Sequence, residues 1–304
     1  MPTTADSRRV LLVGATGRVG RFAARELAAR GASVRALVRD KVRAAALLPD
    51  TVELHRGDLS QPGTLAGALE DIDAVLLVVP VSERQAELEG VLVERVQSLR
   101  REVLIVKVSG LGTASGSSVP SGALHAQTEA LIRATGLPFV FLHPLFFMQN
   151  LAFQFESARR NGVVRAAVGD ARIAMIDAAD IAGVAARLLS GEAVRTGRTL
   201  RLTAATAVGY ADVAAELQRR FSRPVNYVPQ SIDALREQLI QVGQHPWHVE
   251  LLCQFNRAFA SGMAEAVSDD VQQVLGRPPR SLATYLDDAL AGDARPAGED
   301  PFRS

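Results

Sequence analysis

The chain has 304 residues, of which 48% are hydrophobic and 22% are charged, and its formal net charge is +1. This balance is typical of a globular protein and argues against a nucleic-acid or membrane-surface partner. The single cysteine, Cys253, excludes an intramolecular disulfide and a cysteine-based zinc site. No apolar run reaches membrane-spanning length, and residues 1–8 lack the apolar core of a signal peptide. We therefore expect a cytoplasmic protein.

A glycine-rich turn near the N-terminus is the strongest motif. The apolar run Val10–Val13 precedes Gly14, Gly17 and Gly20, and apolar residues at helical spacing follow. The first glycine permits a sharp turn, the second lets the backbone approach a pyrophosphate, and the third lets the helix pack closely on the strand. A second strand is predicted over residues 33–38. This strand, turn, helix and strand predict a dinucleotide site at the helix N-terminus.

The end of the second predicted strand indicates which dinucleotide binds. An acidic residue there accepts hydrogen bonds from the ribose 2′-hydroxyl of NAD, whereas an arginine accommodates the 2′-phosphate of NADP. Arg39 occupies this position with Lys41 nearby, and Asp40 comes one residue late for the NAD role. Because a guanidinium pairs well with a phosphate, NADP(H) is favoured over NAD(H). The alternative is that Arg39 is only a solvated loop residue.

Strands and helices continue to alternate along the chain. Further strands are predicted over residues 52–59, 73–80, 103–110 and 137–142, and helices over 64–69, 83–100 and 123–135. Asp58 ends the third strand, where its carboxylate either accepts a hydrogen bond from an adenine amino group or caps a turn. Pro80 ends the fourth strand at the carboxyl edge, where ligands bind in open α/β sheets. The succession predicts an α/β fold with a doubly wound, Rossmann-type parallel sheet.

The pattern becomes less regular after His143. Residues 144–150 are predicted to be an aromatic loop or helix start beneath the nicotinamide. Later elements are predicted as strands over 173–176 and 199–202, and as helices over 180–189, 210–221, 232–242, 248–260, 269–275 and from 282 onwards. Residues 1–150 are expected to form the dinucleotide-binding domain, with 171–203 returning to it. Residues 151–170 and 204–292 would form a smaller, mostly helical substrate or lid region, and 293–304 a disordered tail.

Short motifs along nearly the whole chain resemble the NmrA-like group of atypical short-chain dehydrogenases/reductases, which bind NAD(P). The motifs are Gly-Ala-Thr-Gly-Arg-Val-Gly (14–20), Leu-Val-Arg (37–39), Gly-Asp-Leu (57–59), Val-Ser-Gly (108–110), His125 with Glu129, Gly-Leu-Pro-Phe (136–139), Pro-x-x-Phe-Met-x-Asn (144–150), Asp-Ile-Ala (180–182), Asp-Asp-Val (269–271) and Gly-Arg-Pro-Pro (276–279). This group includes quinone and azo-dye reductases, relatives of isoflavone-type reductases, and regulators that bind NADP without turning it over.

The resemblance implies which residues hold the cofactor and the substrate. The cofactor contacts would be Gly14, Thr16, Gly17, Arg18, Val19 and Gly20 for the pyrophosphate, Arg39 for the 2′-phosphate, Asp58 and Leu59 for the adenine, and Val78, Val79, Pro80 and Ser109 along the ribose and nicotinamide. Phe146 and Phe147 would help to wall the nicotinamide and substrate pocket. Apart from the resemblance, Asn150 and Trp247 are further candidates for this pocket, with Trp247 as a roof. A simpler interpretation of Trp247 is packing within the lid.

The sequence lacks the usual catalytic pair of short-chain reductases, a tyrosine four residues before a lysine. None of the three tyrosines, Tyr210, Tyr227 and Tyr285, has a lysine four residues after it. By its place thirteen residues before Pro138, His125 resembles the catalytic lysine of isoflavone-type reductases and a histidine of quinone-reductase-like members. A helix N-terminus disfavours imidazolium, so a neutral His125 would either exchange a proton or hydrogen-bond the nicotinamide ribose or carboxamide. A purely structural histidine is the alternative.

Other polar residues near this position carry weaker predictions. Glu129 lies one helical turn after His125 and could orient it, although a solvated glutamate is the simpler interpretation. His143 stands where the family usually has arginine and is expected to fill space. His245 and His248, near Glu250, lack the regular paired spacing of metal ligands, so no metal site is expected.

The sequence therefore predicts an NADPH-dependent reductase that transfers hydride to a small quinone-like, enone or carbonyl acceptor. Such acceptors are electrophilic enough to need little acid help, which agrees with the missing tyrosine–lysine pair. The alternatives are a non-catalytic NADP-binding redox sensor or regulator and a biosynthetic tailoring enzyme of secondary metabolism. The expected partner is a small-molecule substrate, and an oligomer is compatible with the sequence but not indicated by it.

Overall fold

A seven-stranded parallel sheet forms the centre of the protein in the computed structural model, which describes residues 8–110, 112–117, 119–192 and 196–291. The strands lie in the order β3-β2-β1-β4-β5-β6-β8, and each neighbouring pair is parallel. Their bounds are β1 (Arg9–Val13), β2 (Ser33–Val38), β3 (Glu53–Arg56), β4 (Ala74–Leu77), β5 (Leu104–Val108), β6 (Phe139–Pro144) and β8 (Arg198–Leu202). The strand order reverses between β1 and β4, the position where doubly wound sheets bind ligands. The predicted Rossmann-type α/β fold is confirmed.

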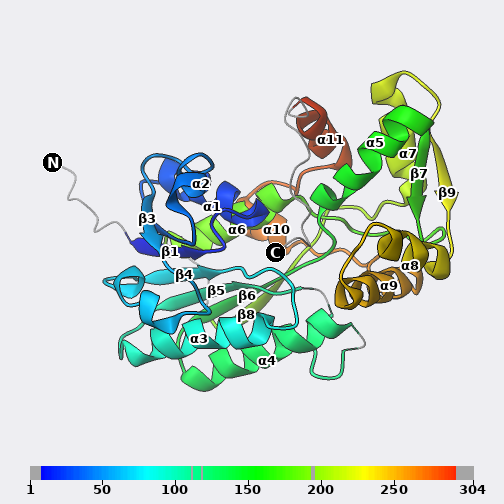
Figure 1. Ribbon diagram of the computed structural model, residues 1–304. Helices are drawn as coiled ribbons and strands as arrows, with labels where there is room; N and C mark the ends of the chain where they lie inside the picture. Colours follow the sequence, from blue (N-terminus) through cyan, green and yellow to red (C-terminus); the bar gives the residue numbers. More distant parts are fainter. Residues whose placement is uncertain (1–7, 111, 118, 193–195, 292–304) are drawn as a thin grey trace.

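Helices cover both faces of this sheet, as Figure 1 shows. One face carries α1 (Arg18–Ala29) and α6 (Ala178–Leu189), which pack against each other, and the other carries α3 (Gln85–Ser98) and α4 (Pro120–Thr135). A short helix, α2 (Lys41–Ala45), follows β2.

The strands read as continuous apolar runs because both of their faces are buried. Val10 and Leu12 of β1 enter the hydrophobic core beneath α1 and α6, whereas Leu11 and Val13 enter the core beneath α3 and α4. Successive side chains of a strand point to opposite faces, so one five-residue strand contributes to both cores.

A second lobe lies at one end of the sheet, on the right of Figure 1. It contains η3 (Met148–Leu151), α5 (Ala152–Asn161), β7 (Val163–Ala166), α7 (Tyr210–Phe221), β9 (Asn226–Pro229), α8 (Ile232–Gln241), α9 (Pro246–Ala260) and α11 (Leu282–Ala291). The strands β7 and β9 pair in parallel as a separate two-stranded sheet, and a hydrophobic core of its own holds much of the lobe together. The helix α10 (Asp270–Leu275) instead packs against α6 and β8 of the first lobe.

Two predicted elements are wrong. Residues 64–69 do not form one helix but parts of two separate 3₁₀ turns, η1 (Pro62–Thr64) and η2 (Gly67–Leu69). Glycine within this segment disfavours a continuous helix. Residues 173–176 form no strand, because they make only isolated bridges from Ile173 to Val208 and from Ile176 to Phe147. The paired strands β7 and β9 and the helices α2 and α5 were not predicted, and the predicted tail 293–304 lies outside the described residues.

Candidate functional site

The glycine turn after β1 has the geometry of a backbone that leaves room for a ligand. Gly14 has φ +80°, and a Cβ built on it would lie 2.1 Å from the carbonyl oxygen of Val78. A Cβ on Gly20 would lie 2.2 Å from the Gly14 oxygen, so these two glycines are required by close backbone packing. A Cβ on Gly17 meets only the Gly14 oxygen, at 3.3 Å. The turn therefore closes tightly on the sheet side and stays open at Gly17.

The first turn of α1 faces this opening. Gly17 is its N-cap and supplies no side-chain hydrogen bond to the helix, while its own N–H donates to the Gly14 carbonyl at 3.0 Å. Backbone N–H groups at a helix N-terminus bind anions well when no side chain caps them. The residues present therefore fit a pyrophosphate.

The carboxyl ends of β2 and β3 place one arginine and two carboxylates close together. Arg39 is exposed directly after β2, and Asp40 caps α2 by accepting hydrogen bonds from the N–H groups of Val42 and Arg43 at 2.8 and 3.0 Å. Asp40 therefore has a structural task, which leaves Arg39 as the charged group presented at the strand end.

Asp58 forms a local turn after β3. Its Oδ1 accepts hydrogen bonds from the N–H and the hydroxyl of Ser60, each at 2.8 Å. The Ser60 N–H keeps the pKa of Asp58 below its ordinary value, and the charges of Arg39 and Arg84 add to this effect. The ionised carboxylate thus caps a turn, which was the alternative to adenine binding in the sequence analysis. Leu59 beside it is buried.

The segment after β4 lies directly against the glycine turn. Val78 and Val79 are half-buried and Pro80 is exposed, so the chain emerges at the carboxyl edge as predicted. The Val78 N–H donates to the Val13 carbonyl at 3.2 Å, which extends the pairing of β4 with β1.

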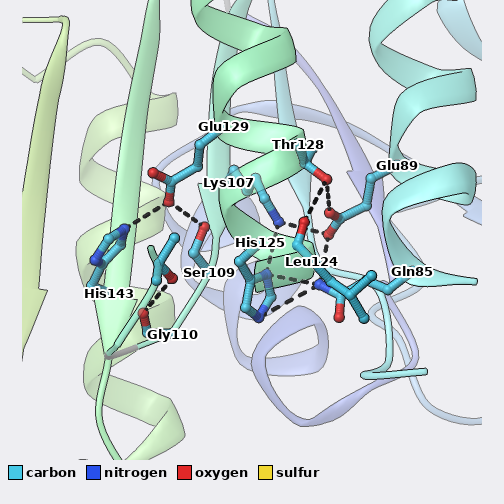
Figure 2. A network of polar contacts seen from close by, with 11 residues as sticks. Gln85, Glu89, Lys107, Ser109, Gly110, Leu124, His125, Thr128, Glu129 and His143 are labelled. Atoms are coloured by element: carbon cyan, nitrogen blue, oxygen red, sulfur yellow. Dashed lines mark hydrogen bonds and ion pairs between the residues drawn. The ribbon is translucent and has the colours of Figure 1, made fainter. Parts of the chain in front are cut away.

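A buried polar network lies between β5 and the helices α3 and α4 (Figure 2). We call one half of it the His125 cluster, whose members are Gln85, Glu89, Lys107, His125 and Thr128. Lys107 Nζ lies 2.7 Å from Glu89 Oε1, and both side chains are 0% exposed. The Thr128 hydroxyl donates to Glu89 Oε2 at 2.6 Å, and Gln85 Nε2 lies 3.3 Å from Glu89 Oε1. The carboxylate is therefore surrounded by donors.

His125 contacts this cluster through Nδ1. Gln85 Nε2 lies 2.7 Å from Nδ1, and Lys107 Nζ lies 3.2 Å from the same atom. Burial lowers the pKa of His125 well below its ordinary value, and the charges of Lys107 and His143 lower it further. The imidazole is therefore neutral at neutral pH. The cause differs from the predicted one, because α4 begins at Pro120 and His125 lies beyond its first turn.

The other half of the network, which we call the Glu129 cluster, consists of Ser109, Glu129 and His143. Glu129 Oε1 accepts from the Ser109 hydroxyl at 2.7 Å and lies 2.6 Å from His143 Nε2. Hydrogen bonds from His143 and Ser109 outweigh burial and keep the pKa of Glu129 below its ordinary value.

Two predictions are wrong at this place. Glu129 is not a solvated surface residue but is 3% exposed, and it orients Ser109 and His143 rather than His125. His143 does more than fill space, since it pairs with the Glu129 carboxylate. The sheet register explains both outcomes. Val108 of β5 pairs with Leu142 of β6, so the next residues along the two strands, Ser109 and His143, lie side by side. Both face α4, which carries Glu129.

The predicted substrate-side residues lie on several elements. Arg18, at the start of α1, donates to Asn150 Oδ1 at 2.8 Å and so connects the glycine turn to η3. Phe146 packs on the second-lobe core with its ring centroid 5.6 Å from that of Phe259, edge to face. Phe147 instead packs on the first-lobe core. The two phenylalanines thus point into different cores.

Trp247 lies where α9 meets the first lobe. It packs with Phe255 and Val81 around a small buried cluster formed by Val119, Leu251 and Ala258. His248 Nε2 lies 3.4 Å from the Val81 carbonyl oxygen. The helix α9 is therefore attached to the segments that follow β4 and precede α4, which agrees with lid packing for Trp247.

Sequence reasoning missed Gln85, Glu89, Lys107 and Thr128. One signal was present: Lys107 interrupts an otherwise apolar run from Val103 to Val108, and a lysine in a strand buried on both faces requires a partner. The partner could not be identified because Glu89 lies 18 residues earlier, on a different element.

Several negative observations apply to the part of the chain that the structure describes. No group of three or more histidine, cysteine, aspartate or glutamate side chains could hold a metal ion there. No helix among those residues is both long and apolar enough to span a membrane. Tyr210 and Tyr285 are buried in the second-lobe core, and Tyr227 packs against it, with its hydroxyl donating to the Gly169 carbonyl at 2.8 Å.

Comparison with known proteins adds sequence relatives and fold neighbours. The chain is 29% identical over 276 residues to an NAD(P)H azoreductase of Xenophilus azovorans, covering 91% of this chain and 96% of the relative. It is 30% identical over 283 residues to (4-alkanoyl-5-oxo-2,5-dihydrofuran-3-yl)methyl phosphate reductase of Streptomyces griseus, with 91% and 96% covered.

A solved structure shares the fold. The NADPH-dependent quinone oxidoreductase of Escherichia coli in complex with NADPH superimposes with a TM-score of 0.84 at 23% identity, covering 92% of this chain and 99% of that chain. The model of the NmrA-like family matches residues 6–286. With a match over nearly its whole length, the chain belongs to the NmrA-like family.

Proposed function

We propose that this protein is an NADPH-dependent reductase that transfers hydride to a small quinone-like, enone or carbonyl acceptor. The coarser statement, that the chain is an NAD(P)H-dependent oxidoreductase, follows from its family and from relatives named as azoreductase and quinone oxidoreductase. What we propose beyond this statement is the class of acceptor and the preference for NADPH over NADH.

The cofactor would be held by the glycine turn and Arg39. The open face of Gly17 and the uncapped start of α1 suit the pyrophosphate, and the exposed Arg39 guanidinium suits a 2′-phosphate. Asp40 supports this choice, because its Oδ1 is already bound by two backbone N–H groups of α2. These contacts hold the Asp40 carboxylate at the start of α2.

The neutral state of His125 is the observation that supports the proposed class of acceptor. When bound, the nicotinamide would supply the hydride, and the residues around the carboxyl end of β5 would bind and orient the acceptor. His125 is 5% exposed and neutral, so it holds no extra proton to give to the product. This favours acceptors whose reduction needs a hydrogen bond at an oxygen rather than strong acid help. Quinones, enones and activated carbonyls have that property.

The test is NADPH consumption with a panel of quinones, enones, azo dyes and aldehydes. We expect turnover with at least one electrophilic class and a higher kcat/KM for NADPH than for NADH. Tight NADPH binding without turnover of any acceptor would contradict the reductase and support a redox sensor. A His125→Ala variant that keeps both kcat and cofactor affinity would show that His125 is structural.

A further inference from the structure

We propose that the buried Glu89–Lys107 ion pair, acting with Gln85, is a positioning device that fixes His125 as the imidazole tautomer with its proton on Nε2. In this form His125 donates a hydrogen bond from Nε2 and cannot accept a proton there. The role of that donor in turnover rests on the reductase function proposed above, whereas the tautomer itself does not.

The orientation of the Gln85 amide is the first step. Its Nε2 lies 3.3 Å from Glu89 Oε1 and 2.7 Å from His125 Nδ1. An amide oxygen in this place would face a carboxylate oxygen, so the NH₂ group occupies it and uses one hydrogen for each neighbour. The second distance, 3.5 Å from Gln85 Nε2 to His125 Nε2, is longer, so this N–H is directed at Nδ1.

This orientation leaves a buried acceptor without a partner. Gln85 is 0% exposed, and its Oε1 has no hydrogen-bond partner among the residues that the structure describes. Turning the amide over would move this oxygen next to the Glu89 carboxylate and to His125 Nδ1. The unpartnered oxygen is a cost of this orientation, and the alternative, an amide oxygen facing the Glu89 carboxylate, is worse because both groups only accept.

Lys107 is the second step. Its ammonium lies 2.7 Å from Glu89 Oε1 and 3.2 Å from His125 Nδ1, and an ammonium group only donates. Both neighbours of Nδ1 are therefore donors. A hydrogen on Nδ1 would oppose both, so Nδ1 carries the lone pair, and a neutral ring must then carry its proton on Nε2.

The Nε2 edge of the ring faces the end of β5. A Cβ placed on Gly110 would lie 3.7 Å from His125 Cδ2 and 3.8 Å from Nε2, and apart from its neighbours in the chain it would meet no other atom of the described residues within 4 Å. The absence of a side chain at Gly110 thus leaves space beside the Nε2–H, next to Ser109. A ligand with an acceptor oxygen, such as a carbonyl or carboxamide, matches this donor.

Charged and titratable groups surround His125 from every packed element. Lys107 comes from β5, Glu89 from α3, His143 from β6 and Glu129 from α4 itself. The buried Lys107 charge and the histidine on β6 disfavour a second proton on the ring, and burial acts in the same direction. The device therefore sets both the charge and the tautomer of His125.

The tautomer is measured directly on the full chain by ¹⁵N NMR of the histidine rings, with His125 assigned by its absence from a His125→Asn variant. We expect a pyridine-type Nδ1 and a pyrrole-type Nε2 that stay unchanged between about pH 5.5 and 8.5. A proton on Nδ1, or titration within this range, would overturn the proposal. Because no acceptor or turnover is involved, this result is independent of the proposed reductase function.

The link to the ion pair is tested with the charge-neutral double variant Glu89→Gln/Lys107→Met. Without the Glu89 charge the Gln85 amide can turn and accept from Nδ1–H, and without Lys107 no ammonium donates to Nδ1. We therefore expect the Nδ1–H tautomer to appear and kcat to fall about tenfold or more at unchanged NADPH affinity. A double variant that keeps the Nε2–H tautomer and the parent kcat would show that the pair is only structural. If it does not fold, Gln85→Leu replaces it. Lys107 still donates to Nδ1 in this variant, so the Nε2–H tautomer is expected to remain, while the loss of the second contact to Nδ1 leaves the ring less firmly held and lowers kcat. A Gln85→Leu protein with the Nδ1–H tautomer or with the parent kcat would contradict the proposal.

The matched control is Gln97→Leu, the same exchange at an exposed position of α3. It is expected to leave the tautomer, kcat and KM unchanged. An equal loss of kcat in Gln85→Leu and Gln97→Leu would contradict a specific role for the Gln85 amide.

Discussion

Lys107 Nζ and Glu89 Oε1 lie 2.7 Å apart in the interior of the protein, and neither side chain is exposed to solvent. The contact joins a central strand of the sheet, β5, to α3, one of the helices that cover it. A buried ion pair of this kind adds little net stability, because desolvation offsets most of the attraction. Removing only one partner is nevertheless strongly destabilising, because it leaves a buried charge without compensation. Its place beside His125 agrees with a positioning role.

Removing one partner of this pair should destabilise the fold. Lys107→Met leaves the Glu89 carboxylate buried without its cation, so we expect the free energy of unfolding to fall by about 3–5 kcal/mol. Urea unfolding followed by circular dichroism measures the loss. Lys41→Met, at an exposed position, serves as control and should change stability by less than about 0.5 kcal/mol. A Lys107→Met protein as stable as the parent would contradict the buried pair.

Stability should depend on pH through His125. The pKa of His125 is lower in the folded protein than in the unfolded chain, so the unfolded chain binds more protons in the window below the unfolded pKa. The free energy of unfolding should therefore fall as the pH decreases from about 6.5 towards 5, with a slope of up to about 1.4 kcal/mol per pH unit from this group. Measuring the unfolding midpoint at several pH values in His125→Gln and the parent separates this contribution. An unchanged slope in the variant would assign the pH dependence to other groups.

The glycines of the turn should respond differently to substitution. Gly17→Ala adds a Cβ 3.3 Å from a single carbonyl oxygen, so the fold should persist with a small loss of stability. The added methyl group occupies the face offered to the pyrophosphate, so NADPH affinity should fall about tenfold or more. Fluorescence titration with NADPH measures it. Gly63→Ala, whose Cβ would meet nothing within 4 Å, is the matched control. Equal affinities for NADPH in the two variants would place the pyrophosphate elsewhere.

Arg39 should decide between the two cofactors. Arg39→Ala is expected to weaken NADPH binding by about tenfold to a hundredfold, because it removes a charge-assisted contact to the 2′-phosphate, and to leave NADH binding nearly unchanged. Parallel titrations with both cofactors measure this selectivity. Arg25→Ala, on the exposed side of α1, controls for the loss of one positive charge. A similar loss for NADH and NADPH would contradict the assignment of Arg39.

Local patterns were sufficient to predict the sheet and the dinucleotide turn. The continuous apolar runs arise because parallel strands are buried on both faces, and this constraint acts on neighbouring residues of the chain. The three glycines after β1 likewise fall within seven residues, from Gly14 to Gly20, so their spacing is visible in the sequence although Gly14 also packs against the distant Val78 carbonyl. Short elements such as β7 and β9 carry too few residues to show a period, and they form only because they pair with each other in the second lobe.

The partners of His125 in the polar network could not be predicted from the sequence. His125 was singled out, but its partners were not, because Gln85 lies 40 residues and Lys107 18 residues away along the chain. Glu129, at helical spacing from His125, was the obvious local partner, yet its carboxylate contacts Ser109 and His143 instead. The parallel sheet, the glycine turn and the arginine at the end of β2 were predictable from the sequence, because each leaves a pattern among neighbouring residues: apolar runs, glycine spacing and a charge directly after a strand. The buried charges around the histidine could be identified from the folded chain alone, because the pairing of β4, β5 and β6 brings α3 and α4 together over β5 and no local pattern encodes that meeting.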